Sequence, residues 1–112
     1  MNKSFFAAAI LAIAVLPACS KSTHEEQIGT VGDTMAYDTT SFSVQTGQTV
    51  HLTLKNNGTT PAMTHNWVLV KPGKEADVAT AGMAAGEASN FVKAGDADIL
   101  ASTPLCSCNR YR

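Results

Sequence analysis

The sequence contains few charged residues and no excess of either sign. Charged side chains make up 15% of the 112 residues, with 8 basic residues against 9 acidic ones. So little charge excludes a disordered polyelectrolyte, and without a basic excess the chain lacks the positive surface that nucleic-acid phosphates require. We therefore expect one small folded domain with no nucleic-acid partner.

Long apolar runs are also scarce. The one long run covers residues 5–16, directly after Lys3 and Ser4, and ends in the tetrad LPAC at Cys19. A membrane-spanning helix needs about 20 apolar residues, so a run of this length is typical of a signal peptide. The tetrad resembles the lipobox of bacterial lipoproteins, in which the cysteine becomes the lipidated first residue. We predict a lipoprotein signal peptide at residues 1–18 and lipidation of Cys19; the alternative is an ordinary signal peptide cleaved near Cys19.

The residues after Cys19 bear on location and on where the folded part begins. Ser20, rather than Asp, favours transport to the outer membrane by the rule for such lipoproteins. Residues 19–32 are polar and show no sustained period of 2 or 3.6 residues. They predict a flexible tether between the lipid anchor and a domain at residues 33–112.

Within this domain the pattern predicts strands first and a helix later. Apolar and polar residues alternate over 41–45 and again over 49–55, which predicts two strands with one buried face each. Residues 65–70 form a nearly continuous apolar run, typical of a central strand covered on both faces. Residues 75–85 have an alanine-rich, helical composition, and Ile99 begins a further strand. This order predicts a β-sandwich with one helical insertion.

One segment carries a more specific signal. Residues 63–70 read MTHNWVLV, and this segment resembles the first copper-ligand segment of azurin and auracyanin, the blue copper proteins of the cupredoxin family. The resemblance extends over residues 33–105, with the segments in the family's order. It implies an all-β, cupredoxin-like Greek-key β-sandwich with a small helical insertion, which binds copper at one type 1 site.

The same resemblance implies site residues. His65 is the expected equatorial copper ligand through a ring nitrogen, and the backbone carbonyl of Thr64 is expected near the weak axial position. A trigonal set of two histidines and one cysteine with a weak axial neighbour accommodates both Cu(I) and Cu(II), so little rearrangement accompanies each electron. Trp67 and the apolar strand would keep the site dry.

The end of the sequence departs from the family. There, two more strands lead to a loop that supplies the cysteine, the second histidine and the axial methionine. Residues 106–112 read CSCNRYR, which does not resemble the family's next segment, and neither His nor Met follows Met83. We therefore expect a family-like domain to about residue 105, an atypical tail at 106–112, and both the sandwich and the copper site incomplete in this chain.

The predicted function is one-electron transfer in the periplasm by a lipid-anchored, azurin-like copper protein whose partners are periplasmic redox proteins. We expect no enzyme, because the sequence has no Ser-His-Asp order, phosphate loop or paired-carboxylate signature. The alternative is a copper-binding or copper-delivery lipoprotein without electron transfer, in which His65 and the exposed thiols of Cys106 and Cys108 hold Cu(I). Met63 and Met83 are interpreted as packing residues.

Overall fold

The computed structural model describes residues 22–112. Its elements are β1 (Thr23–Gly29), β2 (Thr49–Asn56), β3 (Val68–Val70), the helix α1 (Glu75–Ala85), the 3₁₀ turn η1 (Glu87–Ser89), β4 (Ile99–Ser102) and β5 (Arg110–Tyr111). The predicted signal peptide and Cys19, the predicted lipidation site, lie outside the described residues. No helix in the described part of the chain is long and apolar enough to cross a membrane.

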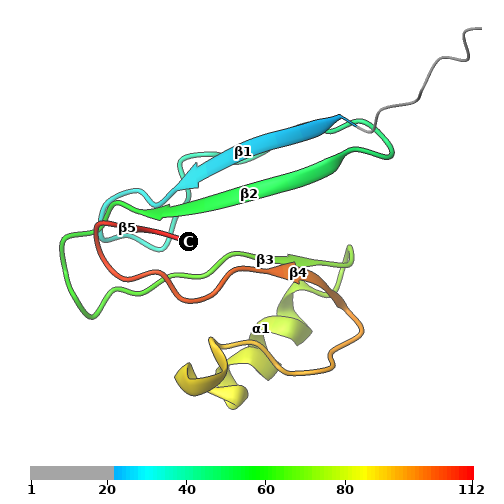
Figure 1. Cartoon of the computed structure of the whole chain (residues 1–112). Helices are drawn as coiled ribbons and strands as arrows, with labels where there is room; N and C mark the ends of the chain where they lie inside the picture. Colours follow the sequence, from blue (N-terminus) through cyan, green and yellow to red (C-terminus); the bar gives the residue numbers. More distant parts are fainter. Residues whose placement is uncertain (1–21) are drawn as a thin grey trace, which may run out of the picture.

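The strands form two sheets with the helix outside them. A three-stranded sheet has the order β1-β2-β5, and a two-stranded sheet pairs β3 with β4. The β3–β4 pair lies between the larger sheet and α1, so the molecule has three layers (Figure 1). The buried apolar residues are few: Leu54 and Cys106 are fully buried, and Ile28 and Val78 are nearly so.

The strand β1 corrects the predicted tether. It runs parallel to β2 along its whole length, from the pair Thr23 and Thr49 to the pair Gly29 and Lys55. The prediction of a flexible segment at 19–32 is therefore wrong for residues 23–29. Five of its seven residues are polar, and only Ile28 and Gly29 at its end are buried. The backbone ladder with β2 therefore holds the strand, and its sequence has no run of apolar residues that would predict it.

The predicted strand at residues 41–45 is also wrong. These residues have no regular secondary structure and lie in the long crossover from β1 to β2. Phe42 and Val44 are 38% and 48% exposed. Instead of entering the core, the ring of Phe42 stacks on the ring of His24 on β1, with the ring centroids 6.0 Å apart.

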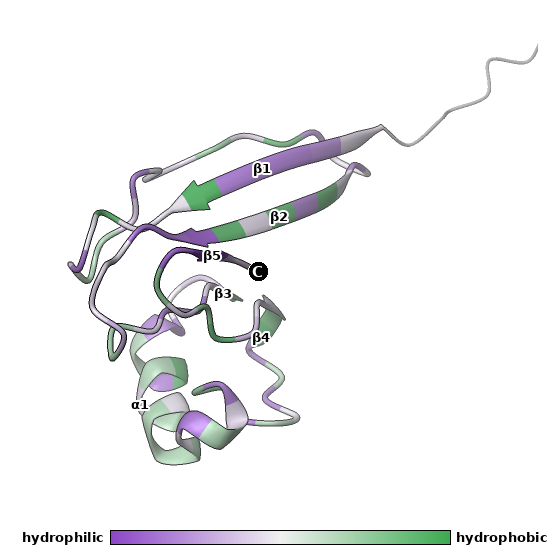
Figure 2. Cartoon of the chain, turned by 60° about the vertical axis from the view of Figure 1, so that its left-hand side comes forward, coloured by the Kyte–Doolittle hydropathy of each residue, from purple (hydrophilic) through white to green (hydrophobic). Residues whose placement is uncertain are grey.

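The strand predicted over residues 49–55 is confirmed by β2, along which apolar and polar residues alternate (Figure 2). Leu54 is fully buried and His51 is exposed, as the alternation indicates. The C-terminal residues add to this sheet, because β5 pairs antiparallel with the end of β2. The amide of Arg112 donates to the carbonyl of Leu54 at 2.8 Å, and the amide of Leu54 donates back at 2.6 Å.

The central strand predicted at residues 65–70 is shorter and more exposed than expected. Only Val68–Val70 form β3, which pairs with β4 alone among the described strands. Leu69 is exposed, so the strand is not covered on both faces. The first residue of the predicted strand, His65, instead forms an isolated antiparallel bridge with Cys106.

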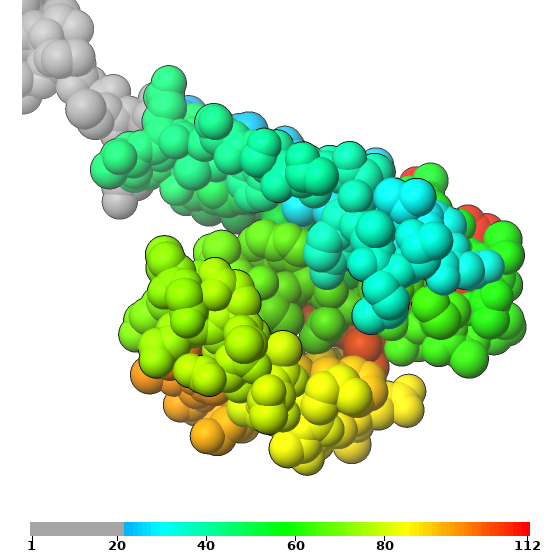
Figure 3. All heavy atoms as spheres, turned by 180° about the vertical axis from the view of Figure 1, so that it is seen from behind, coloured from blue at the N-terminus to red at the C-terminus, as the bar shows by residue number. Residues whose placement is uncertain are grey.

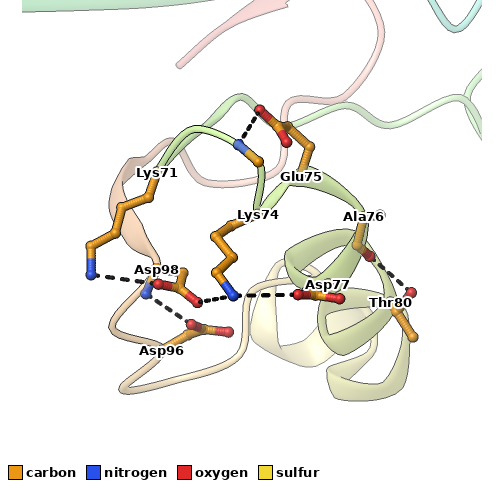
Figure 4. Close-up of polar contacts among 9 residues, drawn as sticks. Lys71, Lys74, Glu75, Ala76, Asp77, Thr80, Asp96 and Asp98 are labelled. Carbon is orange, nitrogen blue, oxygen red and sulfur yellow. Dashed lines mark hydrogen bonds and ion pairs between the residues drawn. The ribbon is translucent and has the colours of Figure 1, made fainter.

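The helix α1 has the predicted bounds, Glu75–Ala85. Glu75 and Asp77 lie in its first turn, where acidic side chains interact favourably with the helix dipole. Lys74, just before the helix, forms ion pairs with Asp77 at 3.7 Å and with Asp98 at 4.0 Å (Figure 4). Because Asp98 also pairs with Lys71 at 3.4 Å, these contacts tie the start of α1 to the turn before β4.

Candidate metal centre

His65 is the predicted ligand that the structure places most clearly. Its amide donates to the carbonyl of Cys106 at 3.1 Å, and the amide of Cys106 donates back at 2.7 Å. Its side chain is 8% exposed, and Nε2 is buried with no hydrogen-bond partner among the described residues. A buried polar atom without a partner is rare in folded proteins. This nitrogen is therefore available to a ligand that can take its lone pair.

Asn56 fixes the backbone on both sides of His65. Its amide Nδ2 donates to the carbonyl of Met63 at 2.7 Å and to the carbonyl of Cys106 at 2.9 Å. Its Oδ1 accepts the hydroxyl of Thr30 at 3.2 Å and the amide of Gly58 at 2.8 Å. All four bonds are made by a residue with no exposed surface. Sequence reasoning missed Asn56; the signal was a polar residue that continues the buried face of β2 after Leu54.

The residues after His65 are also held by polar contacts. The carbonyl of Asn66 accepts the hydroxyl of Tyr37 at 2.6 Å, and its side-chain amide donates to the carbonyl of Asn90 at 2.6 Å. Partial burial raises the pKa of the Tyr37 hydroxyl above its ordinary value of 10.0. The amide of Trp67 donates to the hydroxyl of Thr103 at 2.9 Å. The predicted ligand segment is thus anchored to three separate parts of the chain.

A cavity of about 640 Å³ lies beside His65. It is open to solvent on one side and is bordered by α1, by β3, by the loop after β1 and by the segment before His65. The surface is hollowed between the cyan loop and the yellow-green helix (Figure 3). Its lining includes Thr64 and is mostly apolar. The role of the Thr64 carbonyl as an axial neighbour of copper stays a prediction.

The two cysteines of the tail differ in environment. Cys106 is fully buried, and its thiol donates to the carbonyl of Arg110 at 3.0 Å. Cys108 is partly exposed, and neither residue is in a disulfide. The structure therefore brings the backbone of Cys106 beside His65, but it does not provide the exposed pair of thiols that the C-x-C hypothesis requires. To bind copper, Cys106 would have to leave its hydrogen bond and lose its proton.

The other two histidines are engaged elsewhere. Nδ1 of His51 lies 2.9 Å from a carboxylate oxygen of Glu25, and Nε2 of His24 lies 3.0 Å from one of Glu26. Within residues 22–112 no three His, Cys, Asp or Glu side chains are grouped so that they could hold a metal ion. The described residues thus fit copper at one imidazole and do not by themselves complete a trigonal set of two histidines and one cysteine.

Comparison with known proteins identifies the family. The model of copper-binding proteins of the plastocyanin/azurin family matches residues 24–105. The chain belongs to this family. The match begins inside β1, in agreement with the strand that replaces the predicted tether. The cofactor of the family is copper, as the sequence analysis predicted.

Individual relatives support the same assignment. Auracyanin-A of Chloroflexus aurantiacus is 41% identical over 85 residues, which are 74% of this chain and 51% of the relative. Azurin iso-2 of Methylomonas sp. strain J is 43% identical over 79 residues, 68% of this chain and 61% of the relative. The chain therefore spans only about half to three fifths of the length of these relatives.

Solved structures confirm the predicted cupredoxin fold. The structure of auracyanin A, a "blue" copper protein, matches with a TM-score of 0.74 and 38% identity over 80% of this chain and 73% of that one. The azurin iso-2 of Methylomonas sp. strain J matches with a TM-score of 0.73 and 36% identity over 80% of this chain and 70% of that one. The all-β sandwich with a small helix is thus the architecture of this plastocyanin/azurin family member.

Proposed function

We propose that this plastocyanin/azurin family member is an azurin-like copper protein of the periplasm, with an incomplete type 1 site, that transfers single electrons between redox proteins, with His65 as one copper ligand. The supporting observation is the imidazole of His65, which is buried in the family-matched segment with an unpartnered Nε2. Copper, when bound, supplies a one-electron couple.

The chain's own residues would bind and orient in this proposal. His65 donates the lone pair of a ring nitrogen. Asn56 and Tyr37 hold the backbone around it through hydrogen bonds to Met63, Cys106 and Asn66. The burial of His65 would keep water from the imidazole, and such a dry shell tunes the potential of a metal site.

Copper titration of the full chain tests the role of His65. We expect His65→Ala to weaken Cu(II) binding by roughly tenfold or more, because even the loss of an outer-sphere contact costs about that much. His51→Ala is the matched control, since His51 is exposed and lies on β2, and it should bind copper as the wild type does. Equal affinity of the His65 variant and the wild type would end the ligand assignment.

Electrochemistry tests the electron-carrier role. We expect a reversible Cu(II)/Cu(I) couple in the copper-loaded chain, and its absence would contradict the proposal. We also expect this chain to lack the intense thiolate-to-copper absorption band of a complete blue site. The reason is that the described residues place no second imidazole beside His65 and keep the Cys106 thiol hydrogen-bonded.

We further propose that redox partners dock at the apolar rim of the cavity, to which exposed Met35 and Met83 contribute.

We also propose a lipid anchor at Cys19 in the outer membrane. Cys19→Ser should release the protein from membranes into the soluble periplasmic fraction, and density separation of the two membranes should find the wild type in the outer one. Recovery of the Cys19→Ser variant with membranes would refute the anchor.

A further inference from the structure

We propose that β2 pairs along its open edge with β2 of a second copy of this chain, so that the larger sheets of two copies join into one continuous sheet. On the side away from β1, β5 covers only Lys55 and Asn56 of β2, and Arg112 reaches Leu54. The short strand β5 thus ends part-way along β2 (Figure 1). Among the described residues no strand lies on that side of residues 49–53, the open stretch of β2.

Alternate residues of the open stretch direct their backbone polar groups away from β1. The amide and the carbonyl of Leu54 point to the side of β5, where both bond to Arg112. Backbone groups alternate in direction along a strand, so those of Val50 and Leu52 point to the same side. Within residues 22–112 no strand pairs with them there. Two amides and two carbonyls are therefore available to a partner strand.

The open stretch lacks the features that keep sheet edges apart. It reads TVHLT, without lysine or proline, and its register with β1 has no bulge. Natural edge strands usually carry such protection. The opposite edge of the sheet, β1, carries Glu25 and Glu26, and pairing of two β1 strands would bring these acidic side chains together. The edge suited to pairing is therefore that of β2.

The open stretch is complementary to a second copy of itself. In an antiparallel pair with His51 opposite its symmetry mate, Val50 faces Leu52 of the second copy, and the two residues exchange both backbone hydrogen bonds. On the other face Thr49 lies opposite Thr53. Apolar pairs and threonine pairs of this kind stabilise antiparallel sheets. Charge opposes the pairing little, because the stretch contains no acidic or basic residue besides His51 and the whole chain has a net charge of -1.

The neighbouring contacts fix the length of the pairing. At one end of the open stretch Arg112 occupies the edge beside Leu54. At the other end the chain turns, with the amide of Gln48 donating to the carbonyl of Gln45 at 3.1 Å. The overlap is confined to residues 49–53 of each copy, so the interface is small and the dimer is weak. Because each copy uses its one open stretch, association stops at two copies.

Disulfide trapping tests the register. In the pair of His51 with its mate the Cα atoms would be about 4.5 Å apart, within the range that a disulfide spans. In a full-length Cys19→Ser/Cys108→Ser background, where Cys106 is buried, His51→Cys should form a disulfide-linked dimer on mild oxidation. Lys55→Cys is the matched control, because Lys55 lies on the same face of β2 but is paired with β5, and it should remain monomeric. Equal crosslinking of the two variants would overturn the proposal.

Sedimentation equilibrium tests association without a crosslink. For the full-length Cys19→Ser chain under reducing conditions, the average mass should rise with concentration from one copy to two. His51→Lys can keep the contact with Glu25, which lies 2.9 Å from His51 Nδ1, but it places two positive charges opposite each other in the dimer. We expect it to weaken the dimer by about fivefold.

The neutral, β-branched His51→Thr is the control and should dimerise as the parent chain does. A parent chain that stays monomeric up to its solubility limit, species larger than two copies, or equal dimer affinities of His51→Lys and His51→Thr would each contradict the pairing. The His65→Ala variant should dimerise normally, because His65 is not on β2. The dimer and the copper ligand can therefore be disproved separately.

Discussion

His65 and Cys106 face each other across an isolated antiparallel bridge, joined by two backbone hydrogen bonds of 3.1 and 2.7 Å. The bridge joins the predicted ligand segment to the C-terminal residues, and the Cys106 side chain is completely buried. Two residues later, Cys108 is partly exposed. The accessibility of the two thiols should therefore differ, although they are close in sequence.

Alkylation can measure this difference. We expect iodoacetamide to modify Cys108 in the folded chain well before Cys106, because Cys106 must be uncovered by local unfolding before its thiolate can react. Peptide mass spectrometry assigns the label to each cysteine, and labelling in urea is the control in which both react alike. Equal rates in buffer would show that the bridge between His65 and Cys106 opens readily.

Asn56 should be the most sensitive polar residue of the site region. Asn56→Ala removes four hydrogen bonds and leaves the carbonyls of Met63 and Cys106 without this donor. We expect the free energy of unfolding to fall by about 3 kcal/mol, measured by urea denaturation. The control is Asn57→Ala, which removes one side-chain bond to the carbonyl of Thr30 and should cost about 1 kcal/mol. A smaller loss for Asn56→Ala than for Asn57→Ala would contradict the assigned role.

The elements that were predicted correctly are those whose own composition or apolar–polar alternation indicates a helix or a half-buried strand. The helix α1 was predicted with its full bounds because its alanine-rich composition is a local signal. The strand β2 was predicted because Leu52 and Leu54 alternate with polar residues. The segment that contains β1 was interpreted as a tether because its side chains are mostly polar, while its stability comes from a backbone ladder with a strand more than twenty residues away.

The candidate site was predicted only in part for the same reason. The motif around His65 is local, so it was recognised. The burial of Nε2 and the four bonds of Asn56 depend on contacts between distant segments. No periodicity in one strand or helix carries that information. Residues 41–45 show the opposite error: their apolar and polar side chains alternate as in a strand, but these residues form no strand in the structure.

Asp33 should make the fold sensitive to acid. Its carboxylate accepts the amide of Thr60 at 3.0 Å and the hydroxyl of Thr59 at 2.9 Å, and hydrogen bonds from these two residues lower its pKa from 3.8 to about 2. Because the folded state has the lower pKa, this contribution to stability is fully present above the unfolded pKa of 3.8 and is lost as the pH falls toward 2.

Urea denaturation at several pH values can test this dependence. Asp33→Asn should be less stable than the wild type at neutral pH, and the difference should shrink as the pH falls from about 4 to about 2. Glu87→Gln is the control, because it removes an exposed carboxylate of η1 and leaves the Asp33 contacts in place. A stability difference between Asp33→Asn and the wild type that does not change with pH would assign the effect to something other than the ionised carboxylate.

Gly82 should tolerate no side chain, although it lies inside a helix. A Cβ there would clash with the carbonyl oxygen of Phe91, a backbone atom that cannot rotate away as a flexible side chain could. Gly82→Ala improves helix propensity by about 1 kcal/mol, but overpacking typically costs about 1–3 kcal/mol. We therefore expect a net loss of stability in urea denaturation. Ala84→Gly, on the exposed side of α1, should lose about 1 kcal/mol through propensity alone. A Gly82→Ala variant more stable than the wild type would mean that α1 and the Phe91 segment separate easily, and that the wall they form for the cavity is not fixed.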